Sequence, residues 1–233
     1  MALSAATVRA NLAEVREEVA AAARRSGRSP EDVEIVAAVK YVPLEDLGAL
    51  VEAGVTHVAE NRAQELECKR EAYPDLVWDF IGQLQSRKVK VLAPLVRRIH
   101  SVASDSALRE LGKHAGAAPS EAASGGPGEA ASPRVEFLVE VNIAGEEGKA
   151  GIAPDDLAAF IERAPFPPVG LMTMPPLADS PEDSRRWFAA LSALAERHDL
   201  PHLSMGTTQD FAVAVEEGAT MVRVGSHLYR DHR

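Results

Sequence analysis

Short apolar segments alternate with amphipathic stretches along most of the chain. The segments are VEIVAAVK, HVAEN, VWDFIG, RIHSVAS, VEFLVEVNI, VGLMTM, HLSMG and MVRVGS, and each of the first seven precedes a helical pattern. Alternation of this kind is typical of βαβ units, which place parallel strands in one sheet. Eight units in 233 residues predict an α/β fold, a single (β/α)8 barrel of the TIM type, with an open doubly wound sheet as the alternative.

Two regions lie outside this alternation. Residues 1–27 predict an extra N-terminal amphipathic helix, whose frequent charges are unlike those of a signal peptide. Residues 115–134 consist of Ala, Gly, Pro, Ser and Glu with one final Arg. Because this composition buries too little apolar surface to offset its ordering entropy, we expect a disordered loop there. We therefore expect residues 1–233 to form one barrel domain.

Charge and composition narrow the classes of function. The net charge of -10 argues against nucleic acid and against anionic membranes as partners. No apolar run approaches the length of a membrane span, about 20 residues. Cys68 is the single cysteine, and the seven histidines show no metal-ligand spacing. We expect a cytoplasmic, monomeric protein that binds no metal.

In a barrel the carboxyl ends of the strands share one face, and binding sites form there. The residues expected at these ends are Lys40, Asn61, Gly82, Ser101, Asn142, Met174, Gly206 and Gly225. The loops after the last two strands are rich in glycine and small hydroxyl residues: Ser204, Gly206, Thr207 and Thr208 in the seventh, Gly225 and Ser226 in the eighth. Turn glycines and helix caps would explain either loop alone. Together they favour a phosphate site, since barrels commonly bind phosphate at these two positions.

Two basic residues lie in or next to apolar segments. Arg223 stands between Val222 and Val224, and a buried guanidinium needs a partner, for which an acid such as Glu60 or Glu140 and a ligand are both open. Lys40 ends the first segment, where it would be a solvated side chain or a point charge for phosphate. It could also form a Schiff base with a phosphate-bearing carbonyl ligand. That role requires partial desolvation to supply neutral amine, which we expect the apolar strand to provide.

These residues resemble a known family. The segments AVKYVP, VAENRAQE, WDFIGQLQSRKVK, HSVAS, VNIAGEEGKAGI, GLMTMPP, LSMGTTQDF and GATMVRVGSHLY run in order from about residue 33 to 229. They are similar to the YggS/PROSC-type pyridoxal phosphate homeostasis proteins, relatives of the alanine racemase barrel domain. FIGQLQSRKVK and LSMGTTQDF are the most specific of these segments.

The resemblance implies a barrel that holds pyridoxal 5′-phosphate (PLP) as a Schiff base on Lys40. It implies Arg223 opposite the pyridine nitrogen, and it adds the strand-end residue Asn61 to the cofactor-binding set. It also implies phosphate contacts from Ser204, Thr207, Thr208, Gly225 and Ser226.

The chain departs from the family pattern at several places. Val39 and Tyr41 replace the usual Ser and Thr beside the lysine, Gln83 replaces a His, and Thr207–Thr208 replaces Met-Ser. These changes affect the surroundings of the ring and leave the lysine and the arginine in place.

Three functions are compatible with these residues. The first is a carrier in intracellular PLP (vitamin B6) homeostasis that passes PLP to apo-enzymes and has no catalytic turnover. The second is a small PLP-dependent amino-acid racemase. The third is a barrel enzyme without a cofactor, in which Lys40 forms an imine with a phosphorylated substrate, as in an aldolase.

Overall fold

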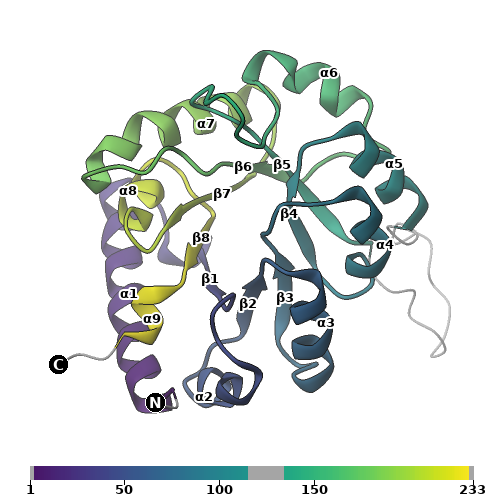
Figure 1. Ribbon diagram of the computed structural model, residues 1–233. Helices are drawn as coiled ribbons and strands as arrows, with labels where there is room; N and C mark the ends of the chain where they lie inside the picture. The colour runs from purple at the N-terminus through teal and green to yellow at the C-terminus, as the bar shows by residue number, and fades with distance from the viewer. Residues whose placement is uncertain (1–2, 115–133, 231–233) are drawn as a thin grey trace, which may run out of the picture.

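The computed structural model describes residues 3–114 and 134–230. In this part of the chain the parallel strands follow one another around a closed barrel, in the order β1 to β8 (Figure 1). Their bounds are β1 Glu34–Ala38, β2 His57–Glu60, β3 Val77–Phe80, β4 Arg98–Val102, β5 Glu136–Glu140, β6 Gly170–Met172, β7 His202–Thr207 and β8 Met221–Val224. Each predicted apolar segment coincides with one of them, and β7 runs one residue beyond its segment, so the predicted barrel is confirmed.

Helices surround the barrel (Figure 1). They are α1 Ala5–Arg25, α2 Leu47–Glu52, α3 Ala63–Ala72, α4 Val89–Leu92, α5 Asp105–His114, α6 Leu157–Glu162, α7 Arg185–Arg197, α8 Phe211–Glu216 and α9 Ser226–Tyr229. Short 3₁₀ turns lie at Pro30–Asp32, Leu44–Asp46, Ser86–Lys88, Pro154–Asp156 and Pro181–Ser184. Ser104 caps the start of α5, because its hydroxyl accepts a hydrogen bond from the N–H of Ala107 at 3.2 Å.

The expected N-terminal helix is α1, which runs along the outside of the barrel beside α8 and α9 (Figure 1). Val8, Leu12, Val15 and Val19 are buried at the spacing of one helix face. On the same helix the buried amide of Asn11 donates to the carbonyls of Leu228 and Arg230, at 3.1 and 2.9 Å. The start of the chain therefore holds its last turn in place.

Most of the apolar core lies between the strands and the helices. The barrel interior holds a separate, small apolar cluster of Val36, Ala59, Leu138, Met172 and Met221. The rest of that interior carries polar and charged side chains, among them Asp79, Arg98, His100, Ser204 and Arg223, all of them buried.

Two expectations are corrected or left aside. Ser204, Gly206 and Thr207 belong to β7 instead of the loop that follows it, because the strand continues to Thr207. The expected disordered loop at 115–134 lies outside the described residues except for Arg134.

Candidate functional site

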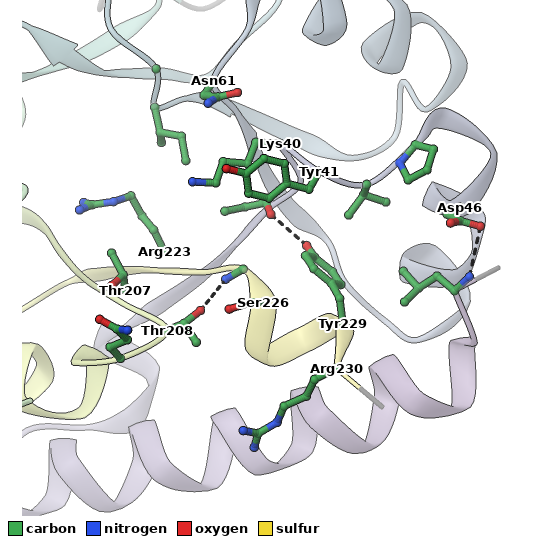
Figure 2. A pocket seen from close by; sticks show the side chains of 18 of the residues that line it. Lys40, Tyr41, Asp46, Asn61, Thr207, Thr208, Arg223, Ser226, Tyr229 and Arg230 are labelled. Carbon is green, nitrogen blue, oxygen red and sulfur yellow. Dashed lines mark hydrogen bonds between the residues drawn. The ribbon is translucent and has the colours of Figure 1, made fainter. Parts of the chain in front are cut away.

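A cavity of about 960 Å³ opens at the carboxyl ends of the strands. Figure 2 shows Lys40 and Asn61 on one side of it and Thr207, Thr208 and Ser226 on the other, with Arg223 between them. Of the predicted cofactor-binding residues, the following line this cavity: Lys40, Asn61, Thr207, Thr208, Arg223, Gly225 and Ser226. Residues from the first, second, seventh and eighth strands and their loops thus meet at one place.

Lys40 lies two residues beyond the end of β1, in a tight turn. The N–H of Val39 donates to Ala59 O at 2.9 Å, and the N–H of Val42 donates back to Val39 O at 3.0 Å. The Lys40 side chain is exposed, with Nζ 4.9 Å from the centroid of the Tyr41 ring. The desolvation expected from the apolar strand is therefore wrong for the protein by itself; only a ligand that covers the amine would remove its water.

A buried ion pair fixes the turn that carries Lys40. Lys69 Nζ lies 2.6 Å from Glu60 Oε2 and donates to Val39 O at 3.0 Å, and both side chains are almost fully buried. The other oxygen of Glu60 accepts the N–H of Asn61 at 2.7 Å. Glu60 is thus committed to Lys69 and is not the partner of Arg223 that the sequence suggested.

Asn61 follows β2, and its side-chain oxygen is buried with no hydrogen-bond partner among the described residues. The next strand end comes very close, since a Cβ on Gly82 would lie 2.0 Å from Asn61 O. Only glycine fits there. A buried amide oxygen without a partner costs stability unless a ligand satisfies it, which makes Asn61 a candidate contact for a bound molecule.

Arg223 is 4% exposed and points its guanidinium from β8 into the cavity (Figure 2). Nη1 donates to Ser204 Oγ at 2.6 Å, and Nη2 donates to Thr173 O and Met174 Sδ, both at 2.9 Å. Burial lowers its pKa to about 10, opposed by the charges of Asp210 and Glu140, so the group stays cationic at neutral pH. Three of its five N–H groups are used in these contacts, and two remain for a ligand.

Glu140 is the second acid that the sequence offered to Arg223. Burial raises its pKa, although the charges of Arg223 and Lys149 act in the opposite direction. Glu140 therefore interacts with the Arg223 guanidinium through charge. The hydrogen bonds of Arg223 described above go to the neutral groups of Ser204, Thr173 and Met174.

The hydroxyls of the seventh and eighth loops are engaged to different degrees. Thr207 donates its hydroxyl to Asp210 Oδ1 at 3.1 Å, and its N–H donates to the same oxygen at 2.8 Å. Thr208 Oγ1 accepts the N–H of Gly225 at 3.1 Å, which joins the two loops (Figure 2). Ser226 is exposed in the cavity wall. The hydroxyls of Thr208 and Ser226 are therefore the groups best placed to donate to an anion, next to the backbone of Gly225.

Ser204 is the one predicted contact that does not line the cavity. It is fully buried inside the barrel, where its hydroxyl lies between Arg223 Nη1 and His100 Nδ1, 2.6 and 2.8 Å away. Gly206 explains this placement. Its φ of +86° and a register shift between Ser204 and Thr207 turn the strand, so Ser204 and Thr207 serve different surfaces.

The structure also adds cavity residues that the sequence analysis did not assign to the site. Tyr229 donates its hydroxyl to Ala38 O at 3.2 Å, and burial raises the pKa of its phenol above the usual range. Asp46 accepts the N–H of Leu3 at 3.2 Å, and Met174 reaches in from the loop after β6. Nothing in the sequence marked Tyr229 or Asp46. Asp79 and His100, which contact the site through Ser204, were visible as ionisable residues inside apolar segments.

Two other features lie away from the cavity. Trp78 and Phe80 on β3 are buried in the core. Asn142, shortly after β5, exchanges hydrogen bonds with the backbone of Glu146 in the loop at 145–151, at 2.8 and 3.1 Å. That loop is folded on itself and does not line the cavity.

Within residues 3–114 and 134–230, no helix is long and apolar enough to cross a membrane. The same residues contain no group of three or more His, Cys, Asp or Glu side chains that could hold a metal ion. The cavity instead offers an amine, a guanidinium, an unsatisfied amide oxygen and small hydroxyls. This set suits a ligand that carries both a carbonyl and an anionic group.

Comparison of the sequence with known families gives one match over most of the chain. Residues 10–233 match the family described as alanine racemase, N-terminal domain. The pyridoxal phosphate homeostasis protein of Aquifex aeolicus is 37% identical over 234 residues, covering 95% of this chain and 97% of that protein. The protein of the same name from Escherichia coli K12 is 31% identical over 239 residues, covering 94% of each.

Solved structures agree with this match. An unknown protein from Bifidobacterium adolescentis superposes with a TM-score of 0.80 at 28% identity, covering 97% of this chain and 95% of that one. PipY of Synechococcus elongatus, solved with PLP bound, superposes with a TM-score of 0.71 at 26% identity, covering 96% and 100%. A lysine/ornithine decarboxylase from Vibrio vulnificus shares the fold, with a TM-score of 0.66 at 14% identity.

Proposed function

Because the chain belongs to the family of alanine racemase N-terminal domains, we propose that it binds PLP and serves PLP homeostasis. The observation that carries this proposal is the convergence of Lys40, Arg223 and the hydroxyls of the seventh and eighth loops on one cavity. The names of its relatives, two of them pyridoxal phosphate homeostasis proteins, point the same way.

The residues present fit the cofactor. PLP carries an aldehyde, a pyridine nitrogen and a phosphate, and when bound it supplies an electrophilic carbonyl attached to an electron-withdrawing ring. Lys40 offers the amine for a Schiff base, and Arg223 offers N–H groups to the ring nitrogen. Thr208 and Ser226 offer hydroxyl donors to the phosphate, Gly225 holds Thr208 in place through its N–H, and Thr207 adjoins them. Asn61 has an unpartnered buried oxygen at the same cavity, and we assign it to the cofactor as well.

The position of Ser204 changes its expected role. Since its hydroxyl is enclosed between Arg223 and His100, we assign it to the support of Arg223 instead of direct contact with phosphate.

We infer a carrier with little or no turnover. A guanidinium that faces the ring nitrogen donates to it and leaves it unprotonated, which weakens the ring as a sink for carbanion electrons. Racemisation also needs a second base on the opposite face of the substrate, within hydrogen-bond reach. Tyr41 is 83% exposed, and His227 is buried with its Nε2 3.0 Å from Arg230 and 3.7 Å from Glu14. Tyr41 lies at the cavity beside Lys40 but is open to solvent, and His227 does not line the cavity, so neither is positioned as the second base.

An exposed Lys40 in a wide cavity suits release of the cofactor to other proteins. We therefore propose that a monomer in the cytoplasm exchanges PLP with apo-enzymes through this opening. Retention of PLP rests on the covalent link and on the phosphate contacts.

The test is to load the protein with PLP, reduce it with borohydride and map the modified peptide. We expect a yellow protein whose imine band is bleached by borohydride and whose pyridoxyl group is on Lys40. Lys40→Ala should lose the band, whereas Lys149→Ala, which changes a lysine outside the cavity, should keep it. Modification of a different lysine contradicts the assignment.

The same preparation separates the competing functions. An aldolase-type enzyme would form no imine band with PLP and would form one with its substrate. A racemase would exchange the α-hydrogen of an amino acid with solvent deuterium at a catalytic rate, and Lys40→Ala would abolish that exchange. We expect neither result.

A further inference from the structure

A line of buried polar side chains crosses the barrel interior and ends at the cavity. Asp79 Oδ2 lies 3.1 Å from His100 Nε2, and His100 Nδ1 lies 2.8 Å from Ser204 Oγ. Ser204 Oγ in turn accepts a hydrogen bond from Arg223 Nη1 at 2.6 Å. Asp79, His100 and Ser204 are 0% exposed and Arg223 is 4% exposed. Each contact joins a different pair of strands: β3 to β4, β4 to β7, and β7 to β8.

The protonation of the line follows from its surroundings. Burial lowers the pKa of His100 more strongly than the hydrogen bond to Asp79 raises it, so the imidazole is neutral at pH 7. Burial tends to raise the pKa of Asp79, but the hydrogen bond and the charges around it lower the pKa overall, so Asp79 is an anion. A carboxylate only accepts hydrogen bonds. His100 must therefore carry its single proton on Nε2, facing Asp79.

That tautomer sets the direction of the remaining contacts. Nδ1 of His100 has no proton and accepts the hydroxyl proton of Ser204, which leaves the oxygen of Ser204 to accept Nη1–H of Arg223. Donation then runs one way, from Arg223 through Ser204 and His100 to Asp79. Each contact in the line therefore has one donor and one acceptor, and no two donors point at each other.

We propose that Asp79, His100 and Ser204 are positioning residues that fix Arg223 as a cationic donor facing the cavity. The second anchor of Arg223 is Nη2, on Thr173 O and Met174 Sδ. With both ends held, the free N–H groups keep a constant direction. The last link, from Arg223 to the ring nitrogen of PLP, rests on the function proposed above.

Other charges also face these groups. The charges of Asp79, Arg223 and Arg98 act on His100. Arg97 Nη2 lies 3.6 Å from Asp79 Oδ2. Arg98 is paired with Glu34 at 2.8 Å and with Glu136 at 2.6 Å. Around Arg223 the nearby acids are Asp210 and Glu140. None of these lies between two members of the line.

The substitution Asp79→Asn reverses the line for a geometric reason. Asp79 Oδ1 accepts the backbone N–H of Arg98 at 3.2 Å, so the oxygen of an asparagine is required on that side. Its NH₂ group then faces His100 Nε2, which must give up its proton, and the proton moves to Nδ1. Nδ1–H and Arg223 Nη1–H would both point at Ser204 Oγ, and the Ser204 hydroxyl would lose its acceptor.

The first measurement uses the full-length protein without PLP. Long-range nitrogen–proton NMR spectra, with His100 assigned through His100→Gln, show which ring nitrogen carries the proton. We expect Nε2–H in the wild type and in Glu34→Gln, a matched loss of a charged carboxylate outside the line. We expect Nδ1–H in Asp79→Asn. A wild-type Nδ1–H tautomer, or an unchanged tautomer in a folded Asp79→Asn, overturns the proposal.

The second measurement adds PLP and records the dissociation constant and the position of the imine band against pH. We expect Asp79→Asn and Ser204→Ala to weaken binding by roughly tenfold, the scale of one charge-assisted hydrogen bond, and to shift the band. Ser204→Thr, which keeps the hydroxyl, should restore both readouts. Bands and affinities equal to those of the wild type in Ser204→Ala overturn the proposal. Failure of the wild type to bind PLP would overturn the proposed function, whereas the tautomer measured without PLP tests the line independently.

Discussion

The two ends of the barrel use similar polar residues in different ways. At the amino ends of the strands, which we call the floor, Glu34, Arg97, Arg98 and Glu136 form ion pairs between 2.6 and 2.8 Å. At the carboxyl ends, which we call the mouth, Lys40 and Ser226 are exposed, and the amide oxygen of Asn61 has no partner among the described residues. Two buried nitrogens of the floor, Arg97 Nε and His57 Nε2, also have no hydrogen-bond partner among the described residues.

The difference shows how a barrel divides its polar groups between stability and binding. Removing one member of a buried ion pair leaves a charge without compensation, so floor residues act mainly on folding. Mouth residues keep hydrogen-bond donors and acceptors that no other side chain uses, so their replacement mainly changes the affinity for a ligand. Three predictions follow this division, with the largest expected change first.

The floor prediction concerns Arg98→Ala. Arg98 is 6% exposed and pairs with Glu34 and Glu136, whose side chains are about one-third to two-fifths exposed. We expect the free energy of unfolding in urea to fall by about 2–3 kcal/mol, less than for a fully buried pair because water can reach the two acids. The affinity for PLP should stay within a factor of about two of the wild type. Arg163→Ala, which breaks an exposed pair with Asp105, is the control and should cost under about 1 kcal/mol.

The mouth prediction concerns Thr208→Val. This change removes the acceptor of Gly225 N–H and one hydroxyl of the cavity wall. We expect the dissociation constant for PLP to rise by roughly tenfold, or about 1.4 kcal/mol, with a smaller change in unfolding free energy. Thr208→Ser keeps the hydroxyl and should bind as the wild type does. A loss of stability larger than the loss of affinity would remove the contrast between floor and mouth.

The smallest effect is a pH dependence that comes from the barrel interior. Burial lowers the pKa of His57, His100 and His202 below the ordinary value of 6.5. As pH falls below 6.5, the unfolded chain binds protons that the native imidazoles refuse, so stability decreases until each native pKa is reached.

For His100 alone the slope is at most about 1.4 kcal/mol per pH unit. Urea unfolding at neutral and mildly acidic pH measures it. His100→Gln should flatten the dependence. A steeper slope in His100→Gln would mean that His100 is protonated in the native state.

The fold was accessible from the sequence because its signals are local. Each strand is an apolar run and each helix a periodic stretch, and closure of eight such units follows from their number. Lys40, Arg223 and Gly225 were also identifiable, since strand ends converge on one face of any barrel. The cavity brings all three together.

The errors in the site concern contacts that depend on register or on distant partners. A glycine with positive φ shifts the register within β7, so alternation cannot tell that Ser204 faces inward and Thr207 the mouth. The partner of Glu60 is Lys69 on α3. Lys69 lies among charged residues in the sequence, where a lysine is expected to be exposed. The prediction that Lys40 is desolvated was wrong because β1 ends at Ala38, two residues before the lysine.

The hydrogen bonds from Asn11 to the carbonyls of Leu228 and Arg230 also constrain the order in which the protein folds during synthesis. Lys40 leaves the ribosome well before Arg223, Gly225 and Ser226. N-terminal segments generally fold first during translation. The site can therefore be completed only after β8 and α9 have been synthesised and α1 has bound the turn that follows them. Until that moment a nascent chain has Lys40 but not the loops to which we assign the phosphate, and we expect it to retain no PLP.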